Sequence, residues 1–183
     1  MLEFKNVSVS LGANSLSSPF SLIVESGDTV CLQGPHGSGK TRVLSAVLGL
    51  SPLADGFITL DGELITFGSA PYFRKIMAYI PQELPGANIT LTEICHELKL
   101  NIDDLKDVDA ALKDKKISTL STEKVQEMLL EVALKMNRRL LLIDNIRYTP
   151  TIAMLLKRIA EKGTEIIYTC VANQFEYNKV ITL

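Results

Sequence analysis

The residues Gly34-Pro35-His36-Gly37-Ser38-Gly39-Lys40-Thr41 match the pattern G-x-x-x-x-G-K-[ST]. The run before this stretch, residues 29–32, is short, apolar and typical of a β-strand. The run after it, residues 41–50, carries four apolar side chains at helical spacing, which are Val43, Leu44, Val47 and Leu48. The sequence therefore predicts a strand, a glycine-rich loop and a helix in that order.

A loop of this kind points successive backbone N–H groups and the positive end of a helix at one anion. Gly34 and Gly39 supply backbone angles and a close approach that a Cβ atom would obstruct. Lys40 is expected to reach the β- and γ-phosphates of a nucleotide, and the Thr41 hydroxyl to ligate Mg²⁺. We therefore predict nucleotide binding at residues 34–41, with a glycine turn that binds no nucleotide as the alternative.

The composition narrows the class of protein. With 183 residues, 46% of them hydrophobic and 22% charged, the chain is long enough for one globular domain with a sizeable core. A net charge of −2 gives no reason to expect nucleic acid as a partner. Cys31, Cys95 and Cys170 lie far apart, which favours neither a metal site nor a disulfide framework and suits a reducing cytosol. We expect no signal peptide and, because no apolar run approaches about 18 residues, no direct membrane insertion.

The β segments are predicted from alternating side chains and turn residues. Residues 2–11 alternate apolar and polar side chains with a slip at Lys5-Asn6, which predicts a strand with a bulge. Residues 12–18 predict a turn, and Asp61-Gly62 predicts a hairpin. The other strands expected are residues 20–24, 57–60, 63–65, 76–80, 165–169 and 179–183.

The second half of the chain is predicted to be mostly helical. Residues 90–115 form an acidic helical stretch whose apolar face is expected to hold Leu91, Ile94, Cys95 and Leu98. Its carboxylates are predicted to form a solvated face rather than a metal site, and these are Asp103, Asp104, Asp107 and Asp109. His36 and His96 are assigned to solvent or structural positions.

Two further helices flank the most apolar run of the chain. Ser121 is predicted to cap a helix over residues 122–136. The apolar stripe of that helix is expected at Val125, Met128, Leu129, Val132 and Met136. Residues 140–143 predict a buried parallel strand that ends at Asp144. Pro150 is predicted in the first turn of a helix that runs to Gly163.

Four landmarks stand in a fixed order: the loop at 34–41, Gln82 after a short strand, Leu120-Ser121, and the run that ends at Asp144. This order resembles the ATP-binding-cassette (ABC) ATPases, the nucleotide-binding subunits of ABC transporters. In that family a Leu-Ser signature opens a helix, and the Walker B aspartate follows its serine by 23 residues, the same interval as from Ser121 to Asp144. The resemblance covers nearly the whole chain.

The resemblance implies an α/β fold of the P-loop NTPase, ABC type, in which helices flank a mostly parallel core sheet. It also implies an N-terminal antiparallel β subdomain and a short helical subdomain at about residues 90–137, all within a single nucleotide-binding domain over residues 1–183. ATP and Mg²⁺ are the implied ligands.

The resemblance also assigns roles to single residues. Residues 34–41 would bind the phosphates, and Asp144 would hold Mg²⁺ with Thr41 and Gln82. Gln82 would also contact the attacking water, and Leu11 would lie where an aromatic residue normally stacks on adenine. Two alternatives remain open: Gln82 as a plain turn residue, and Asp144 as the cap of the following helix.

Several positions depart from the pattern of the family. Asn145 stands where a glutamate polarises the attacking water, and an amide cannot accept the proton of that water. Cys170 stands where a histidine contacts the γ-phosphate, and a thiol offers only a weak hydrogen bond. The signature continues as Thr122-Glu123-Lys124 in place of Gly-Gly-Gln, and residues 146–150 do not resemble the usual D-loop.

These departures lead to three hypotheses. The first is the ATP-binding subunit of an ABC transporter with weak or partner-dependent hydrolysis, cytoplasmic and peripheral at the inner face of the membrane. Its partners would be a second nucleotide-binding subunit, in a homodimer or a heterodimer, and a transmembrane permease that contacts Pro81, Pro85 and the acidic helical subdomain. The second is a non-catalytic, nucleotide-dependent switch or assembly module. The third is an active soluble ATPase or phosphotransferase that shares only the loop.

Overall fold

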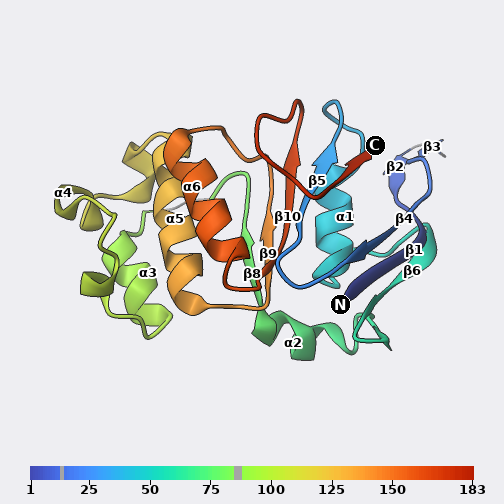
Figure 1. Ribbon diagram of the computed structural model, residues 1–183, viewed down its shortest axis with the longest axis horizontal. Helices are drawn as coiled ribbons and strands as arrows, with labels where there is room; N and C mark the ends of the chain where they lie inside the picture. The colour runs from blue at the N-terminus through green and yellow to red at the C-terminus, as the bar shows by residue number, and fades with distance from the viewer. Residues whose placement is uncertain (13–14, 85–87) are drawn as a thin grey trace.

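The computed structural model of the protein describes residues 1–12, 15–84 and 88–183. Its central layer is a five-stranded sheet in the order β11-β5-β10-β9-β8, and every neighbouring pair is parallel (Figure 1). The strands are β5 (Thr29–Gln33), β8 (Met77–Ile80), β9 (Leu140–Ile143), β10 (Glu165–Cys170) and β11 (Lys179–Thr182). In a parallel sheet the carboxyl ends of the strands share one edge, and ligands bind there in open α/β folds.

A second, antiparallel sheet has the order β4-β1-β6-β7. Its strands are β1 (Leu2–Ser8), β4 (Phe20–Val24), β6 (Asp55–Leu60) and β7 (Glu63–Leu64). The predicted bulge is confirmed, because the pairing of β1 with β4 slips between Phe4 and Val7 and Asn6 has φ of 49°. The predicted hairpin is also confirmed, since Asp61 and Gly62 both have positive φ and join β6 to β7.

The turn predicted at residues 12–18 is wrong for Gly12, Ser15 and Leu16, which lie in strands, and residues 13 and 14 lie outside the described residues. β2 (Ser10–Gly12) and β3 (Ser15–Leu16) form a short antiparallel pair. Ser17 fixes its base, because the Ser17 N–H donates to the Val9 carbonyl and the Val9 N–H donates to the Ser17 hydroxyl. Polar side chains that bond to the backbone made this segment resemble a loop.

The central sheet is covered on both faces. α1 (Lys40–Val47) lies between it and the antiparallel sheet, while α5 (Thr122–Met136) and α6 (Pro150–Ala160) cover the other face (Figure 1). Successive residues of β5 alternate between the two cores: Val30 and Leu32 pack with α1, and Cys31 packs on the side of α5 and α6. The predicted fold class is therefore confirmed.

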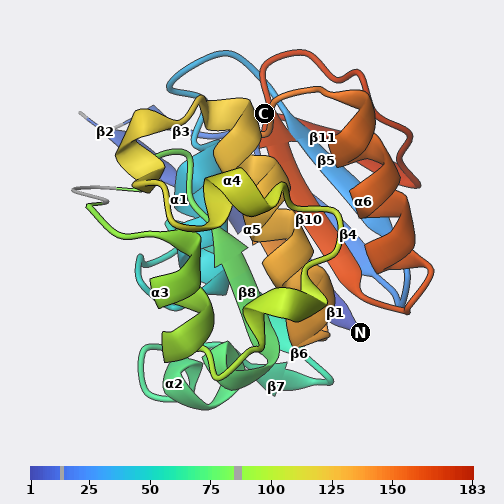
Figure 2. The ribbon, with the colours of Figure 1, turned by 90° about the vertical axis from the view of Figure 1, so that its left-hand side faces the viewer.

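α5 is buried on two sides. Ser121 caps it as predicted, since its hydroxyl accepts a hydrogen bond from the Lys124 N–H at 3.3 Å. Of the predicted stripe, Met128 and Val132 are buried against the helical region that lies in front of α5 in Figure 2. The opposite face is buried as well, against the central sheet, through Leu130, Ala133 and Leu134. The periodicity revealed only one of these faces, because a helix between two layers has no single apolar stripe.

The predicted helical stretch at residues 90–115 is broken into short pieces. These are α3 (Leu91–Glu97), η2 (Ile102–Asp104) and α4 (Ala110–Lys113), and η3 (Ile117–Thr119) follows. α3 ends before Leu98, which is 40% exposed rather than on the buried face, and Lys99 takes a φ of 57°. The four aspartates Asp103, Asp104, Asp107 and Asp109 are exposed, as predicted.

Two short helical segments lie between β7 and β8. α2 (Ala70–Phe73) and η1 (Arg74–Ile76) lead into β8, and neither was predicted. Pro85, predicted to border a partner-binding segment with Pro81, lies outside the described residues.

Within residues 1–12, 15–84 and 88–183, no helix combines the length and the apolar character that a membrane crossing requires.

Candidate nucleotide-binding site

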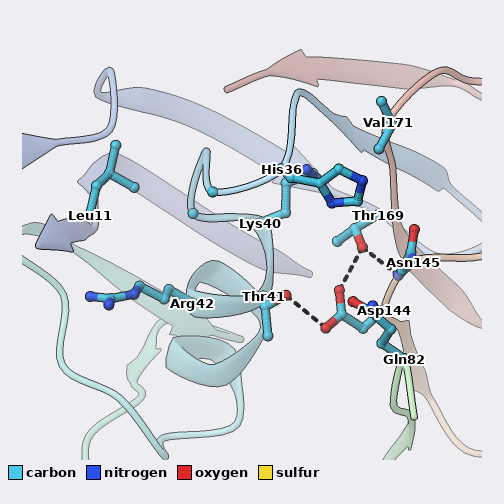
Figure 3. A pocket seen from close by; sticks show the side chains of 12 residues that line it. Leu11, His36, Lys40, Thr41, Arg42, Gln82, Asp144, Asn145, Thr169 and Val171 are labelled. Atoms are coloured by element: carbon cyan, nitrogen blue, oxygen red, sulfur yellow. Dashed lines mark hydrogen bonds between the residues drawn. The ribbon is translucent and has the colours of Figure 1, made fainter.

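A cavity of about 270 Å³ opens at the carboxyl edge of the central sheet (Figure 3). One side is formed by the loop after β5 and the start of α1, and the other by the ends of β9 and β10. The lining residues are Leu11, His36, Gly37, Gly39, Lys40, Thr41, Arg42, Gln82, Asp144, Asn145, Thr169 and Val171. The structure thus brings the predicted loop, Gln82, Asp144 and Asn145 to one place.

Lys40 places an ammonium in this cavity, which Arg42 also lines, and the hydrogen-bond partners of Lys40 are neutral. Its ammonium donates to the carbonyl oxygens of Gly34 and Pro35, each at 2.7 Å, and lies 3.5 Å from the Ser38 hydroxyl. Burial lowers the pKa of Lys40, while the charge of Asp144 acts in the opposite direction. A largely buried ammonium whose hydrogen bonds within the described residues go to neutral oxygens is suited to an incoming anion.

Two glycines of the loop have no room for a side chain. A Cβ on Gly34 would lie 2.5 Å from the Leu183 carbonyl oxygen, and a Cβ on Gly39 would lie 2.7 Å from the Val9 side chain. Gly39 also has φ of 97°, a conformation that other residues seldom adopt. The loop therefore requires both glycines, as the sequence predicted.

Asp144 joins the two sides of the cavity. One of its carboxylate oxygens accepts a hydrogen bond from the Thr41 hydroxyl at 2.8 Å, and the other accepts one from the Thr169 hydroxyl at 2.7 Å. Asp144 does not cap the next helix, because the Thr149 hydroxyl caps α6 by accepting from the Ile152 N–H. Thr41 and Asp144 thus present a hydroxyl and a carboxylate side by side, which are oxygen ligands that suit Mg²⁺.

Asn145 is held in a special backbone conformation. Its φ is 51°, and its N–H donates to the Thr169 hydroxyl at 2.7 Å. Gln126 of α5 supports the same segment: its amide nitrogen donates to the Asn145 carbonyl at 3.2 Å, and its amide oxygen accepts from the Arg147 N–H at 2.8 Å. Gln126 is only 2% exposed. The sequence reasoning missed it, although a polar residue directly after Val125 in an apolar stripe was an available signal.

The remaining predicted residues divide into those that line the cavity and those that do not. Leu11 and the exposed Gln82 line it from different elements, and Figure 3 places Gln82 next to Asp144. The Cys170 side chain does not line it; its thiol lies 3.4 Å from the thiol of Cys31, and Val171 lines the cavity in its place. Arg42, Thr169 and Val171 also line the cavity and were not predicted.

A family model described as "ABC transporter" matches residues 18–147. The chain belongs to the ABC transporter family. The zinc import ATP-binding protein ZnuC of Jannaschia sp. is 33% identical over 152 residues, which are 79% of this chain and 58% of that protein. The spermidine/putrescine import ATP-binding protein PotA of Haemophilus influenzae is 41% identical over 66 residues, which are 36% of this chain and 18% of that protein. The chain thus spans between about a fifth and about three fifths of these relatives.

Solved structures confirm the ABC fold. A putative ABC transporter ATP-binding protein from Pyrococcus furiosus matches with a TM-score of 0.79 at 17% identity, over 100% of this chain and 96% of that chain. A dimeric ATP-binding cassette in a post-hydrolysis state, bound to ADP and Pi, matches with a TM-score of 0.76 at 18% identity, over 94% and 88%.

The segment that the resemblance identified as the ABC signature lies away from the cavity of this chain. Residues 121–124 begin α5 and are absent from the lining of the cavity. Lys124 pairs with Glu127 at 2.9 Å. Thr122 and Gln82 instead line a separate cavity of about 250 Å³ between the segment after β8 and α5.

Proposed function

We propose that the chain is the ATP-binding subunit of an ABC transporter and binds Mg-ATP in the cavity between α1 and the ends of β9 and β10. One observation carries the proposal. The Lys40 ammonium, bonded only to neutral oxygens, faces the same cavity as the paired oxygens of Thr41 and Asp144. A cation beside two oxygen ligands matches a triphosphate with its metal ion.

Each residue then has a defined part. Lys40 would leave the Gly34 and Pro35 carbonyls for the β- and γ-phosphates, while the loop N–H groups bind the same oxygens. Thr41, Asp144 and Gln82 would hold Mg²⁺, which neutralises charge on the phosphate oxygens when it is bound. Leu11 offers the base an apolar contact without stacking.

Hydrolysis by this chain is proposed to be weak or dependent on a partner. Asn145 lines the cavity and can orient a water molecule, but it cannot accept a proton from it. The missing general base is worth about 10²–10⁴ in rate.

The proposed partners are a second nucleotide-binding subunit and a transmembrane permease, which would place the chain at the inner face of a membrane. The names of the relatives support this, since these are import ATP-binding proteins, and one structural neighbour is dimeric. In this proposal the permease, rather than this chain, selects the transported substrate. Pro81 and the exposed acidic face around Asp103 are the proposed contacts with the permease.

A nucleotide-dependent switch without turnover is the second candidate. The observation that favours it is Asn145, which carries a side-chain amide at the position of the general base and whose backbone is held by two hydrogen bonds, one from Gln126 and one to Thr169. In such a module ATP would bind at Lys40 and favour association of two subunits with little hydrolysis.

Thermal unfolding tests the binding proposal. Mg-ATP at about 100 times its Kd adds about 2.7 kcal/mol to the free energy of unfolding, which should raise the Tm by about 5–10 °C. Lys40→Ala should remove most of that shift. Lys157→Ala, which removes an exposed lysine of α6, is the matched control and should keep the shift. An unaltered shift in Lys40→Ala would place the nucleotide elsewhere.

A further inference from the structure

Two cysteines that are far apart in the sequence are neighbours in the core. Cys31 in β5 and Cys170 at the end of β10 place their sulfur atoms 3.4 Å apart. Cys31 is fully buried and Cys170 is 4% exposed. Cys95, which is also buried, belongs to a different hydrophobic cluster, with α3 and α5. The sequence argument against a disulfide rested on spacing along the chain, and the fold of the sheet removes that separation.

The pair lies directly beneath the phosphate loop. Cys31 is three residues before Gly34, and the Gly34 N–H donates to the Cys170 carbonyl at 3.2 Å. In the parallel register Cys31 pairs with Tyr168, and Cys170 pairs with Gln33. The two cysteines are therefore diagonal neighbours on one face of the sheet, and one of them is hydrogen-bonded to the first glycine of the loop.

We propose that Cys31 and Cys170 form a reversible intramolecular disulfide when the folded protein meets a peroxide, and that this bond weakens phosphate binding by the loop above it. Formation of the bond does not depend on the proposed ATP function. Only its consequence for binding does.

Access decides which sulfur reacts first. Cys170 lines a cavity of about 200 Å³ together with His36 and Asn145, whereas Cys31 lines none of the cavities around the loop. Hydrogen peroxide is about the size of two water molecules, so a cavity of this size admits it. A hydrogen bond with Cys31 lowers the pKa of Cys170, and the charge of Lys40 acts in the same direction, while the pKa of Cys31 is raised.

The reaction balances with one peroxide for two thiols. The Cys170 sulfur, having lost its proton, attacks one peroxide oxygen; the O–O bond breaks, and the departing hydroxide takes up that proton to become water. The Cys31 sulfur then attacks the sulfenic sulfur of Cys170; the S–O bond breaks, and the second hydroxide leaves as water with the proton of Cys31. Two thiols are oxidised to one disulfide, and the peroxide is reduced to two waters.

The bond must move the backbone. A disulfide has sulfur atoms about 2.05 Å apart, and diagonal neighbours on a sheet have more widely spaced Cα atoms than disulfides prefer. The end of β10 therefore has to shift toward β5, and the Cys170 carbonyl that receives the Gly34 N–H shifts with it. A strained bond of this kind is reduced more easily than a structural one, which makes the oxidation reversible.

The first experiment uses the folded, full-length chain and needs no nucleotide. After treatment with hydrogen peroxide and removal of the excess, thiols are alkylated under denaturing conditions and the protein is mapped by mass spectrometry. We expect one alkylated residue, Cys95, a peptide that links Cys31 to Cys170, and recovery of all three thiols with dithiothreitol. Cys95→Ser should still form the link, and Cys31→Ser should not. Three free thiols, or oxidation without that link, overturns the proposal.

The second experiment measures the consequence for ATP. Affinity for Mg-ATP should fall about tenfold on oxidation, the size expected for misplacing one N–H donor to a charged group, and should return on reduction. Cys31→Ser should show no peroxide dependence. An unchanged affinity in the cross-linked chain overturns the proposed effect on binding. Absence of ATP binding by the reduced chain counts against the proposed function and leaves the disulfide itself to the first experiment.

Discussion

The two sides of the cavity differ in how many of the functional groups expected of the family they carry. The side formed by β5, the loop and α1 holds the groups proposed to bind the phosphates, with Lys40 and Thr41 lining the cavity. The side formed by the ends of β9 and β10 keeps Asp144, the proposed metal ligand, but carries Asn145 and a core-facing Cys170 at the positions where the resemblance to the family implies a base and a hydrogen-bonding histidine. Binding and hydrolysis are therefore separable in this chain, and each side can be tested alone.

The largest expected effect concerns the missing base. Asn145→Glu should raise ATP turnover by about 10²-fold or more, because a carboxylate accepts the proton of the attacking water. A steady-state phosphate-release assay on the purified chain measures it. Nucleotide affinity should change little, since Asn145 is not among the residues that hold the phosphates.

Asn145→Gln is the matched control, since glutamine has the length of glutamate and no charge. Both variants should lose about 1 kcal/mol of stability, because Asn145 has φ of 51° and asparagine tolerates this region better than longer side chains. Equal turnover in the two variants would show that the charge is not the missing element and would favour the switch hypothesis.

The next effect concerns the residue shared by the two sides. Mg²⁺ is expected to increase the affinity of the parent for ATP. In Asp144→Asn that increase should be about 10- to 100-fold smaller, because a charged oxygen ligand is lost. Without Mg²⁺ the variant should bind ATP at least as well as the parent, since a negative charge near the phosphates is gone. Titration calorimetry with Mg²⁺ or with a chelator measures both. Asp104→Asn, on the exposed η2, is the control, and the same Mg²⁺ dependence in both variants would rule out Asp144 as a ligand.

A smaller effect is expected at Gln126, which supports the second side from α5. Gln126→Met keeps the volume but leaves the Asn145 carbonyl and the Arg147 N–H without their partner, at a cost of about 2 kcal/mol in denaturant unfolding. In the Asn145→Glu background it should lower the restored turnover about tenfold, because the base is less well positioned. Mg-ATP affinity is the internal control and should stay the same. A loss of affinity as large as the loss of turnover would indicate general damage rather than a positioning role.

The smallest effect concerns a buried acid farther along α5. Burial raises the pKa of Glu131 above its ordinary value of 4.5, and the neighbouring Asp107 adds to the shift. The unfolded chain releases this proton first, so stability falls as pH rises from about 4.5 toward the folded pKa. Glu131→Gln should therefore gain stability relative to the parent at pH 7 but not at pH 4.

The gain should stay below about 1 kcal/mol, because Arg158 lies 3.5 Å from Glu131 and offsets part of the penalty. Thermal unfolding at the two pH values measures it. Glu176→Gln, at an exposed position, is the control and should show no such difference. Equal effects of the two substitutions would contradict the shift.

The parts of the site that could be predicted are those set by neighbouring residues. The loop at 34–41, the Asp61-Gly62 hairpin and the Ser121 cap each depend on backbone angles or hydrogen bonds within a few positions of the chain. Asp144 was predictable because an apolar run with an acid at its end is typical of a buried parallel strand. The break at Leu98 was missed although Asn101 and Asp109, whose side chains cap η2 and α4, are local signals of new turns.

The sequence by itself predicted a phosphate-binding loop at residues 34–41, since that is a local pattern with its own chemistry, and its resemblance to the ABC family predicted the roles of Asp144 and Asn145. Only the tertiary structure decided that Cys170 faces Cys31, that Gln126 holds the Asn145 segment and that α5 is buried on two sides. The reason is physical: strand order and register set which distant residues meet, and short apolar strands such as β5 and β10 carry no local signal that specifies their neighbours.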